Sequence, residues 1–269
     1  MDFGANYRRG QTFALWWAAV GVCLLTGCSS SGVTAATLPQ QVPPKYGPAA
    51  VPLSSDRAYF QQTDHPAPDF WALVPFYVPQ RNEYECSVAS VAAVINGLTR
   101  ANRQLAGDVR NVTAASLLET VKTVQWAERM QKGGVDGQVG LTLEQLAEVL
   151  REALRQQGIT DPLIETVRVT ADDPDTRKRW RTALATNEVS AEDMLLIHFT
   201  QDTLTGSEGG PYAHISPIAA YDAATDRALV LDVDREYYEP YWSPAEMIVK
   251  AMSAYTPQYG HGGWIRVSR

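Results

Sequence analysis

The strongest constraint on the fold is a change of hydrophobic pattern near residue 160. Before it, the sequence predicts a helix of small and apolar residues that opens near Cys86, and two amphipathic helices at 114–130 and 143–157. After it, apart from a charged helix at 175–185, we expect strands at 163–169, 194–199, 215–221, 228–233 and 264–267. Helices followed by antiparallel-looking strands are typical of an α+β domain.

Local signals predict several helix ends. Gly97 is expected to end the first helix, because glycine readily adopts the left-handed conformation of a C-cap. Thr142 is expected to cap the helix at 143–157, with Gln145 completing a capping box and Gly158 ending the helix.

The first 55 residues are predicted to lie outside the globular domain at 56–269. Arg8 and Arg9 precede an apolar run at 12–25 that suits a signal-peptide core and is short for a membrane-spanning helix. The run ends in Leu-Thr-Gly-Cys, which resembles a bacterial lipobox, so residues 1–27 are predicted to be a signal peptide and Cys28 to be lipidated. A plain signal peptide is the alternative. Residues 28–55, rich in Ser, Ala and Pro, are predicted to be a lipidated, flexible tether.

These features predict an exported protein that is anchored in the bacterial envelope through its lipid and faces the periplasm. Ser29 after the lipidated cysteine, in place of a retaining aspartate, favours the outer membrane. The net charge of −7 disfavours a nucleic-acid partner, which usually requires a basic protein.

Cysteine usage points to a reactive residue. The chain has three cysteines; Cys23 would leave with the signal peptide and Cys28 would carry lipid, so Cys86 remains as a thiol without a disulfide partner. A lone cysteine in an oxidising compartment is either buried or used. Cys86 begins a predicted helix, whose unpaired N–H groups and partial positive charge stabilise the nucleophilic thiolate. A buried structural cysteine is the alternative.

A thiolate catalyst also needs a base, and His214 has the most suggestive surroundings. It follows a glycine pair that ends at Gly210, where a substrate backbone can come close, and it opens an apolar strand. If the next strand returns through a tight hairpin, Asp232 lies opposite Ser216 and diagonal to His214, within reach of its side chain. Asp232 would then orient the imidazole and leave its other nitrogen for Cys86. A chance pairing of His and Asp in an ordinary hairpin is the alternative.

Gln80 lies six residues before Cys86, in a loop bounded by Pro79. Its amide can donate a hydrogen bond to an oxyanion beside the backbone N–H of Cys86. An ordinary surface loop residue is the alternative.

Two stretches together resemble the phytochelatin synthases, most closely their short bacterial form. One is Gln80-x5-Cys86 with Ala-Ser at 89–90 and Ile-Asn at 95–96; the other is the segment at 214–242, HISPIAAYDAATDRALVLDVDREYYEPYW. The resemblance covers nearly all of the predicted domain. It implies a papain-like cysteine protease fold, with helices that carry the cysteine followed by an antiparallel sheet that carries histidine and aspartate. It further implies one role for each of four residues, namely nucleophile, base, orienting acid and oxyanion donor: Cys86, His214, Asp232 and Gln80.

The chemistry implied by the resemblance is attack of Cys86 on the Cys–Gly amide of glutathione. Glycine leaves, and a γ-glutamylcysteinyl thioester passes to a second glutathione or to water. Arg235 matches an arginine that the family keeps near the site, and the substrate-binding residues are expected to include it with Tyr212, Gly210, Ala213 and Ser216.

No cofactor and no protein metal site are predicted, because no Cys or His cluster has ligand spacing. Heavy-metal ions would enter as metal–thiolate substrate or as activators. The expected partners are glutathione or a related small thiol peptide and, through the lipid, a membrane; a homodimer is left open.

Several positions depart from the family pattern. Ser87 and Ala213 replace glycines, and three positions linked to the acceptor glutathione differ: an aromatic residue, an arginine and a lysine are replaced by Glu85, Gln201 and Tyr237. Glutathione is an anion, so we expect weaker acceptor binding, with hydrolysis competing against transfer or with a different periplasmic peptide as substrate.

Two other functions remain open. One is a papain-like peptidase of the kind that removes leader peptides beside bacteriocin exporters, whose cysteine motif also has an upstream glutamine. The other is a non-catalytic envelope lipoprotein that keeps the fold for binding.

Overall fold

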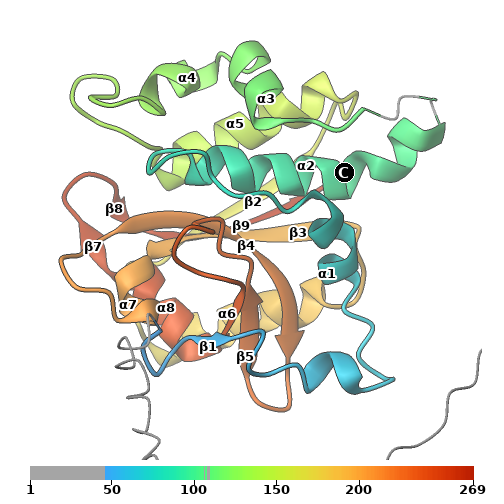
Figure 1. Cartoon of the computed structure of the whole chain (residues 1–269), viewed down its shortest axis with the longest axis vertical. Helices are drawn as coiled ribbons and strands as arrows, with labels where there is room; N and C mark the ends of the chain where they lie inside the picture. Colours follow the sequence, from blue (N-terminus) through green and yellow to red (C-terminus); the bar gives the residue numbers. More distant parts are fainter. Residues whose placement is uncertain (1–45, 106, 108–109) are drawn as a thin grey trace, which may run out of the picture. The chain divides into compact units, whose positions relative to one another are not determined.

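The computed structural model describes residues 46–105, 107 and 110–269. The predicted signal peptide, Cys28 and the predicted tether as far as residue 45 lie outside the described residues. The described chain forms a seven-stranded antiparallel sheet in the order β1-β6-β5-β4-β3-β9-β2, with helices on both faces (Figure 1). This confirms the predicted α+β class, with helices that carry the cysteine preceding a sheet that carries the histidine.

The strands of the main sheet are β1 (Val51–Pro52), β2 (Leu163–Arg168), β3 (Asp193–Thr200), β4 (Ala213–Asp222), β5 (Arg227–Val230), β6 (Tyr241–Pro244) and β9 (Gly263–Ser268). A separate two-stranded ribbon consists of β7 (Tyr255–Thr256) and β8 (Gly260–His261). The helices are α1 (Pro68–Leu73), α2 (Cys86–Leu105), α3 (Ala114–Thr120), α4 (Trp126–Arg129), α5 (Leu143–Gln156), α6 (Pro174–Asn187), α7 (Gln201–Thr205) and α8 (Ala245–Ser253). Short 3₁₀ turns lie at Tyr59–Gln61, Val74–Phe76 and Thr123–Gln125.

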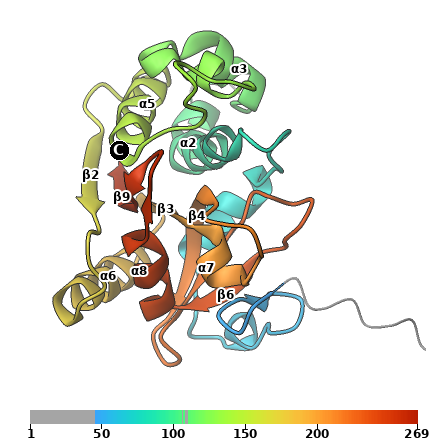
Figure 2. The same cartoon turned by 90° about the vertical axis from the view of Figure 1, so that its left-hand side faces the viewer.

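Two apolar cores lie on the two faces of the sheet. Helices α2, α3 and α5 bury their apolar sides in one core, and α6, α7 and α8 bury theirs in the other (Figures 1 and 2). Because β3 and β4 are buried along almost their whole length, the two central strands contribute side chains to both cores. The sheet is therefore a fixed wall against which α2 is placed.

Helix α2 lies close to β4 because its contact side is made of small residues. Ala89, Ala92 and Ala93 are buried, and the Ser90 hydroxyl donates a 2.8 Å hydrogen bond to the Ile215 carbonyl of β4. This contact places the first residue of the helix, Cys86, beside the beginning of β4.

Helix α2 runs through Gly97, so the prediction that this glycine ends the helix is wrong. A Cβ at Gly97 would lie 3.3 Å from the Met194 side chain and 3.4 Å from the Ala72 carbonyl. The glycine is therefore needed for close packing against α1 and β3, and tertiary contact overrides its tendency to stop a helix.

The helix predicted at 114–130 is also wrong in its length. It is divided into α3, a 3₁₀ turn and α4, because Val124 and Gln125 have positive φ angles of 54° and 53°. The break lets Trp126 become fully buried and donate a 3.0 Å hydrogen bond from its indole to the Ser87 hydroxyl. Helix α4 is thus tied to the start of α2.

Helix α5 follows its prediction, with Thr142 and Gln145 forming the capping box and Gly158 at φ +83° after its last turn. The five predicted strands are present, with ends that differ by up to three residues. Elements that are short or lack a clear hydrophobic period were not predicted from the sequence: α1, α7, α8, β1, β6 and the β7–β8 ribbon.

Part of the predicted tether belongs to the fold. Val51 and Pro52 form β1 and pair with Trp242 and Tyr241 of β6, while Ala50 is buried in the core. The Pro- and Ala-rich composition of this segment does not indicate a strand. An edge strand nevertheless tolerates proline, because it forms ladder hydrogen bonds on one side only.

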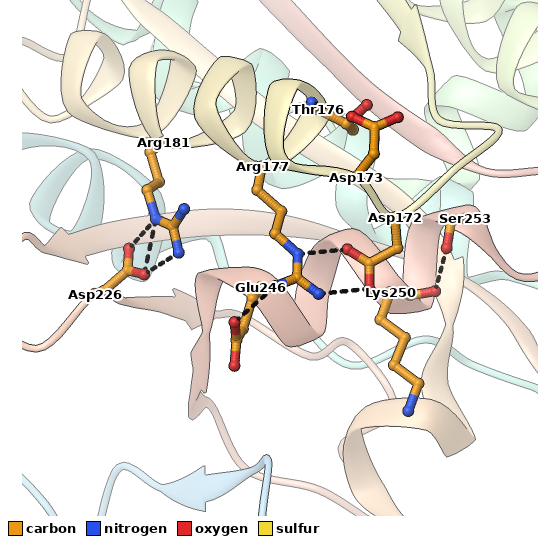
Figure 3. Close-up of polar contacts among 9 residues, drawn as sticks. All are labelled: Asp172, Asp173, Thr176, Arg177, Arg181, Asp226, Glu246, Lys250 and Ser253. Atoms are coloured by element: carbon orange, nitrogen blue, oxygen red, sulfur yellow. Dashed lines mark hydrogen bonds and ion pairs between the residues drawn. The ribbon is translucent and has the colours of Figure 1, made fainter.

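The charged helix α6 is solvated on one side, and its arginines bind carboxylates from neighbouring elements (Figure 3). Arg177 pairs with Asp172 at 2.6 Å and with Glu246 of α8 at 3.0 Å. Arg181 pairs with Asp226 in the turn between β4 and β5 at 2.6 Å. These pairs connect α6 to α8 and to the tip of the β4–β5 hairpin.

In the part of the chain that the structure covers, no helix combines the length and apolar character needed to cross a bilayer.

A buried acid links α1 to the end of α6. Asp69 is fully buried and accepts a hydrogen bond from the Asn187 amide. Burial, together with the negative charges of Glu188 and Asp193, raises the pKa of Asp69 to about 9. The Asp69 carboxyl is therefore neutral in the folded protein at pH 7.

Between the ordinary carboxyl pKa and about 9, the folded state holds a proton at Asp69 that the unfolded state releases, so stability falls as pH rises through this window. We expect the free energy of unfolding to fall by about 3 kcal/mol between pH 6 and pH 8.5 from this group. Asp69→Asn, which cannot ionise, should lose most of that fall. Urea unfolding at the two pH values measures it, with exposed Asp161→Asn as the control; an undiminished fall in Asp69→Asn would contradict the assignment.

Candidate active site

Cys86 is the first residue of α2 and is partly exposed. Among the described residues it is the one cysteine, and it forms no disulfide. The Glu85 carbonyl just before it accepts hydrogen bonds from Val88 and Ala89 in the first turn. Cys86 therefore lies at the helix end that carries unpaired N–H groups and a partial positive charge.

His214 and Asp232 make the predicted contact. The Nε2–H group of His214 donates to Asp232 Oδ1 at 2.8 Å. Strands β4 and β5 pair Asp222 with Arg227 next to the turn and, beyond a β-bulge, Ile218 with Val230. Only the pairing beyond the bulge agrees with the predicted register, which sets Asp232 opposite Ser216. The bulge therefore helps to bring Asp232 beside His214.

Asp232 is completely buried, and its carboxylate accepts hydrogen bonds from four groups. Besides the imidazole, the donors are the Gln201 amide at 2.9 Å, the Tyr241 hydroxyl at 3.0 Å and the Asp234 backbone N–H at 2.9 Å. The support that Gln201 and Tyr241 give to Asp232 was not predicted from the sequence. Gln201 is the first residue of α7 and follows β3 directly. A polar residue directly after the fully buried β3 is the signal that was available.

The electrostatics of the pair favour charge separation. Burial alone would favour a neutral imidazole, but the attraction and hydrogen bond of the Asp232 carboxylate raise the pKa of His214 well above its ordinary value, and the Cys86 thiol contributes to the rise. Burial opposes ionisation of Asp232, but the charge and hydrogen bond of His214 lower the pKa of Asp232. His214 is thus an imidazolium whose Nε2 is engaged, which leaves Nδ1 to face Cys86.

Gln80 lies at the mouth of the site. Its backbone N–H donates a 2.9 Å hydrogen bond to the Val233 carbonyl, which ties the loop before α2 to the segment that carries Asp232. Its side chain lines the same cleft as His214, and its Oε1 is buried without a hydrogen-bond partner. The role of Gln80 as an oxyanion donor stays a prediction.

The cleft beside His214 has a volume of about 570 Å³. Tyr212 and Ala213, both predicted to contact substrate, line it together with Gln80 and Tyr237. A smaller cavity of about 40 Å³ adjoins Cys86 and also includes Ala213 and His214 in its walls.

Gly210 and Ser216, which were also predicted to contact substrate, do not line this cleft. A Cβ at Gly210 would lie 2.4 Å from the Asp202 carboxylate carbon, so this glycine serves loop packing. Ser216 is completely buried in β4, two residues farther into the sheet than His214. Both residues were predicted because they are close to His214 in the sequence. That proximity does not show that β4 is buried from its second residue onward.

Arg235 also lies outside the lining of the cleft. Its guanidinium is 5.0 Å from the centre of the Tyr77 ring, and the Tyr77 hydroxyl donates to the backbone carbonyl of Asp232. Arg235 therefore stacks on a residue that supports Asp232, and its predicted contact with substrate stays a prediction.

The charges of the cleft differ from the expectation based on Glu85. Glu85 is 5% exposed and accepts two hydrogen bonds from Arg81, at 2.6 and 2.7 Å, so its charge is balanced. The carboxylates that line the cleft belong to Glu83, Asp234 and Glu236. Arg81 and the His214 imidazolium also line the cleft, but the charge of Arg81 is paired with Glu85. The three carboxylates therefore outnumber the remaining cation, and the lining is acidic through other residues than predicted.

The described residues contain no group of three or more His, Cys, Asp and Glu side chains arranged to hold a metal ion.

A family model described as Phytochelatin synthase matches the chain over residues 45–263. The chain belongs to the phytochelatin synthase family. Two Arabidopsis thaliana proteins, Glutathione gamma-glutamylcysteinyltransferase 1 and 2, are each 40% identical to it over 57 residues, which is 21% of this chain and 12% and 13% of theirs. The match thus spans about an eighth of the length of these curated relatives of the family.

A search of solved structures finds the Pseudomonas avirulence protein AvrPphB, with a TM-score of 0.33, 12% identity and coverage of 73% of this chain and 100% of that chain. A likeness of this size carries no argument about function.

The charge on His214 depends on Asp232, so Asp232→Asn should lower the pKa of His214. NMR titration of the imidazole resonances measures this change directly and needs no substrate. Exposed Asp64→Asn is the control and should leave the His214 titration in place. An unchanged His214 midpoint in Asp232→Asn would show that the carboxylate does not hold the imidazolium.

Proposed function

We propose that this protein is a cysteine acyltransferase of the phytochelatin synthase type, with glutathione as its acyl donor. One observation carries the proposal: a cysteine at a helix N-terminus adjoins an imidazolium that a buried aspartate holds in place. A structural cysteine needs none of these features. In this proposal Cys86 is the nucleophile, His214 the acid and base, and Asp232 the group that orients the imidazole.

In the first half of the reaction, the Cys86 thiolate attacks the carbonyl carbon of the Cys–Gly amide. The negative charge that develops on the carbonyl oxygen is stabilised by the Cys86 backbone N–H and by the Gln80 amide. His214 then donates its Nδ1 proton to the departing amine, the C–N bond breaks, and glycine leaves. The product is a γ-glutamylcysteinyl thioester on Cys86 and a neutral His214.

In the second half, His214 accepts a proton from the incoming nucleophile. That nucleophile is the amine of a second glutathione or a water molecule, and its attack breaks the thioester and restores the thiolate and imidazolium. The acidic lining of the cleft opposes an anionic acceptor, and Tyr237 offers no cation to offset it. Gln201 does not serve the acceptor either, because its amide binds Asp232. We therefore propose that hydrolysis competes effectively with transfer.

Heavy-metal ions enter this proposal only as part of the substrate, bound to glutathione thiolates, or as activators.

A second candidate function is a peptidase that acts on another periplasmic peptide. The acidic cleft favours it, because carboxylates of Glu83, Asp234 and Glu236 suit a peptide with positive charge better than they suit glutathione. A non-catalytic binding role would use the same cleft without forming an acyl-enzyme.

The test combines intact-mass analysis with a glycine assay. The purified protein is mixed with glutathione, beside Cys86→Ala and with Cys28→Ser as the matched cysteine control. We expect a γ-glutamylcysteinyl adduct and glycine release from the wild type and Cys28→Ser, and neither from Cys86→Ala. γ-Glutamylcysteine should exceed longer products.

Glycine release by Cys86→Ala would overturn Cys86 as the proposed nucleophile. A folded protein with a reactive Cys86 that forms no adduct and releases no glycine would exclude glutathione and favour the peptidase function. If longer products exceed γ-glutamylcysteine, the proposal that hydrolysis of the thioester competes effectively with transfer is wrong.

We also propose that the protein is exported and anchored in the cell envelope through a lipid on Cys28, supported by the order of apolar run, small residues and cysteine at 12–28. Cells that express the chain and are fed an alkyne fatty acid should label it. Cys28→Ser should lose the label and leave the membrane fraction, whereas Cys23→Ser should keep both. Equal labelling of Cys28→Ser would refute the lipid site.

A further inference from the structure

The segment at 46–50 lies against the elements that support Asp232 (Figures 1 and 2). We call this segment the N-terminal strap. Ala49 and Ala50 are buried, which makes the strap part of the folded domain. No strap residue lines the cleft or the smaller cavity beside Cys86. Any influence of the strap on the reaction therefore passes through other residues.

The ring of Tyr46 packs on the tyrosine that binds Asp232. Its centre lies 6.1 Å from the centre of the Tyr241 ring, edge to face at 68°. Tyr241 is fully buried, and its hydroxyl donates to the Asp232 carboxylate at 3.0 Å. Burial raises the pKa of Tyr46, and the negative charges of Glu239 and Asp232 add to the rise, so the ring lies within range of the buried carboxylate. Because aromatic pairs of this geometry stabilise each other beyond the area they bury, Tyr46 helps to fix the Tyr241 ring.

The loop before β6 holds Tyr46 in turn. The Tyr46 hydroxyl oxygen accepts a 2.7 Å hydrogen bond from the Glu239 backbone N–H. The Tyr46 ring also lies 5.5 Å from the ring of Tyr238, centre to centre, in an edge contact. The Tyr238 hydroxyl shares a hydrogen bond with the hydroxyl of Ser207, which comes just after α7. The contacts of Tyr46 thus connect β6, the loop before it and the end of α7.

The strap also fixes α7, the helix that carries Gln201. The Gly47 backbone N–H donates a 2.5 Å hydrogen bond to the carbonyl of Thr205, the last residue of α7. A Cβ at Gly47 would lie 3.1 Å from that carbonyl oxygen, so glycine permits the close approach. A helix of five residues has little stability of its own. The contact with the strap therefore helps to hold Gln201, whose amide donates to Asp232 at 2.9 Å.

We propose that Tyr46 is a positioning residue of the active site, because the strap to which it belongs keeps two donors of Asp232 in place. The proposal rests on the proposed function, since it concerns the imidazolium that the proposed reaction uses. A gap behind Tyr241 would let water compete for Asp232 and screen its charge, which weakens its hold on the His214 proton. Tyr46 does not line the cleft, so its loss should lower kcat and leave KM nearly unchanged.

The experiment compares Tyr46→Ala, Tyr46→Phe and Tyr255→Ala with the wild-type full chain. One readout is NMR titration of His214, which needs no substrate, and the other is the pH profile of glycine release from glutathione. In Tyr46→Ala we expect a lower His214 midpoint, an alkaline limb of the profile at lower pH, and a kcat about tenfold lower. Tyr46→Phe keeps the ring and should retain the wild-type values. Tyr255, which is 63% exposed in β7, is the matched control, and Tyr255→Ala should also retain them.

An unchanged His214 midpoint in Tyr46→Ala would overturn the positioning role, even if the variant unfolds at a lower temperature, because lost stability alone does not move that midpoint. An equal fall of the midpoint in Tyr46→Phe would overturn the ring as the support. If Tyr46→Ala does not fold, Gly47→Ala decides: its Cβ crowds the end of α7 and should lower the His214 midpoint, and an unchanged midpoint would overturn the role of the strap. Failure of the wild type to release glycine would overturn the proposed function, while the His214 titration would still decide on the strap.

Discussion

A single buried carboxylate organises the site. Asp232 is completely removed from water, and an ionised group in that position is tolerated only when hydrogen bonds replace its hydration. The donors come from four different places: the start of β4, the start of α7, strand β6 and the loop after β5. Elements that are distant in sequence are thus held at one point, and the position of His214 is a consequence of that convergence.

The helix that carries Cys86 is held independently of this carboxylate. Its small residues allow close contact with β4, and Ser87 and Ser90 join it to Trp126 and to the Ile215 carbonyl. Sheet and helix meet at the beginning of β4, where the strand is still partly exposed at Ala213. The thiol is therefore accessible while the acid that supports its partner is not.

Much of this arrangement follows from sequence patterns, and the failures have physical causes. The order of helices and strands, the capping box of α5 and the contact of His214 with Asp232 depend on local periodicity and on one hairpin. Gly97 and the break at Val124 depend on packing between distant elements, which local signals do not report. Gln201 shows the same limit at the site, because its partner Asp232 is remote in sequence. Arg81 neutralises Glu85, and the two residues are four apart in the sequence. This is the spacing at which opposite charges pair on a helix, so the sequence contained a signal for this ion pair.

The order of strands in the sheet has a consequence for how the protein folds. Strand β9 lies between β3 and β2, so two strands made much earlier have no partner on that side until residues 263–268 are available. Pairing over such sequence distances is slow, and unpaired edges remain open to other chains in the meantime. Synthesis of β2 and β3 is therefore separated in time from their pairing with β9, and the facing edges of both strands stay unpaired during that interval.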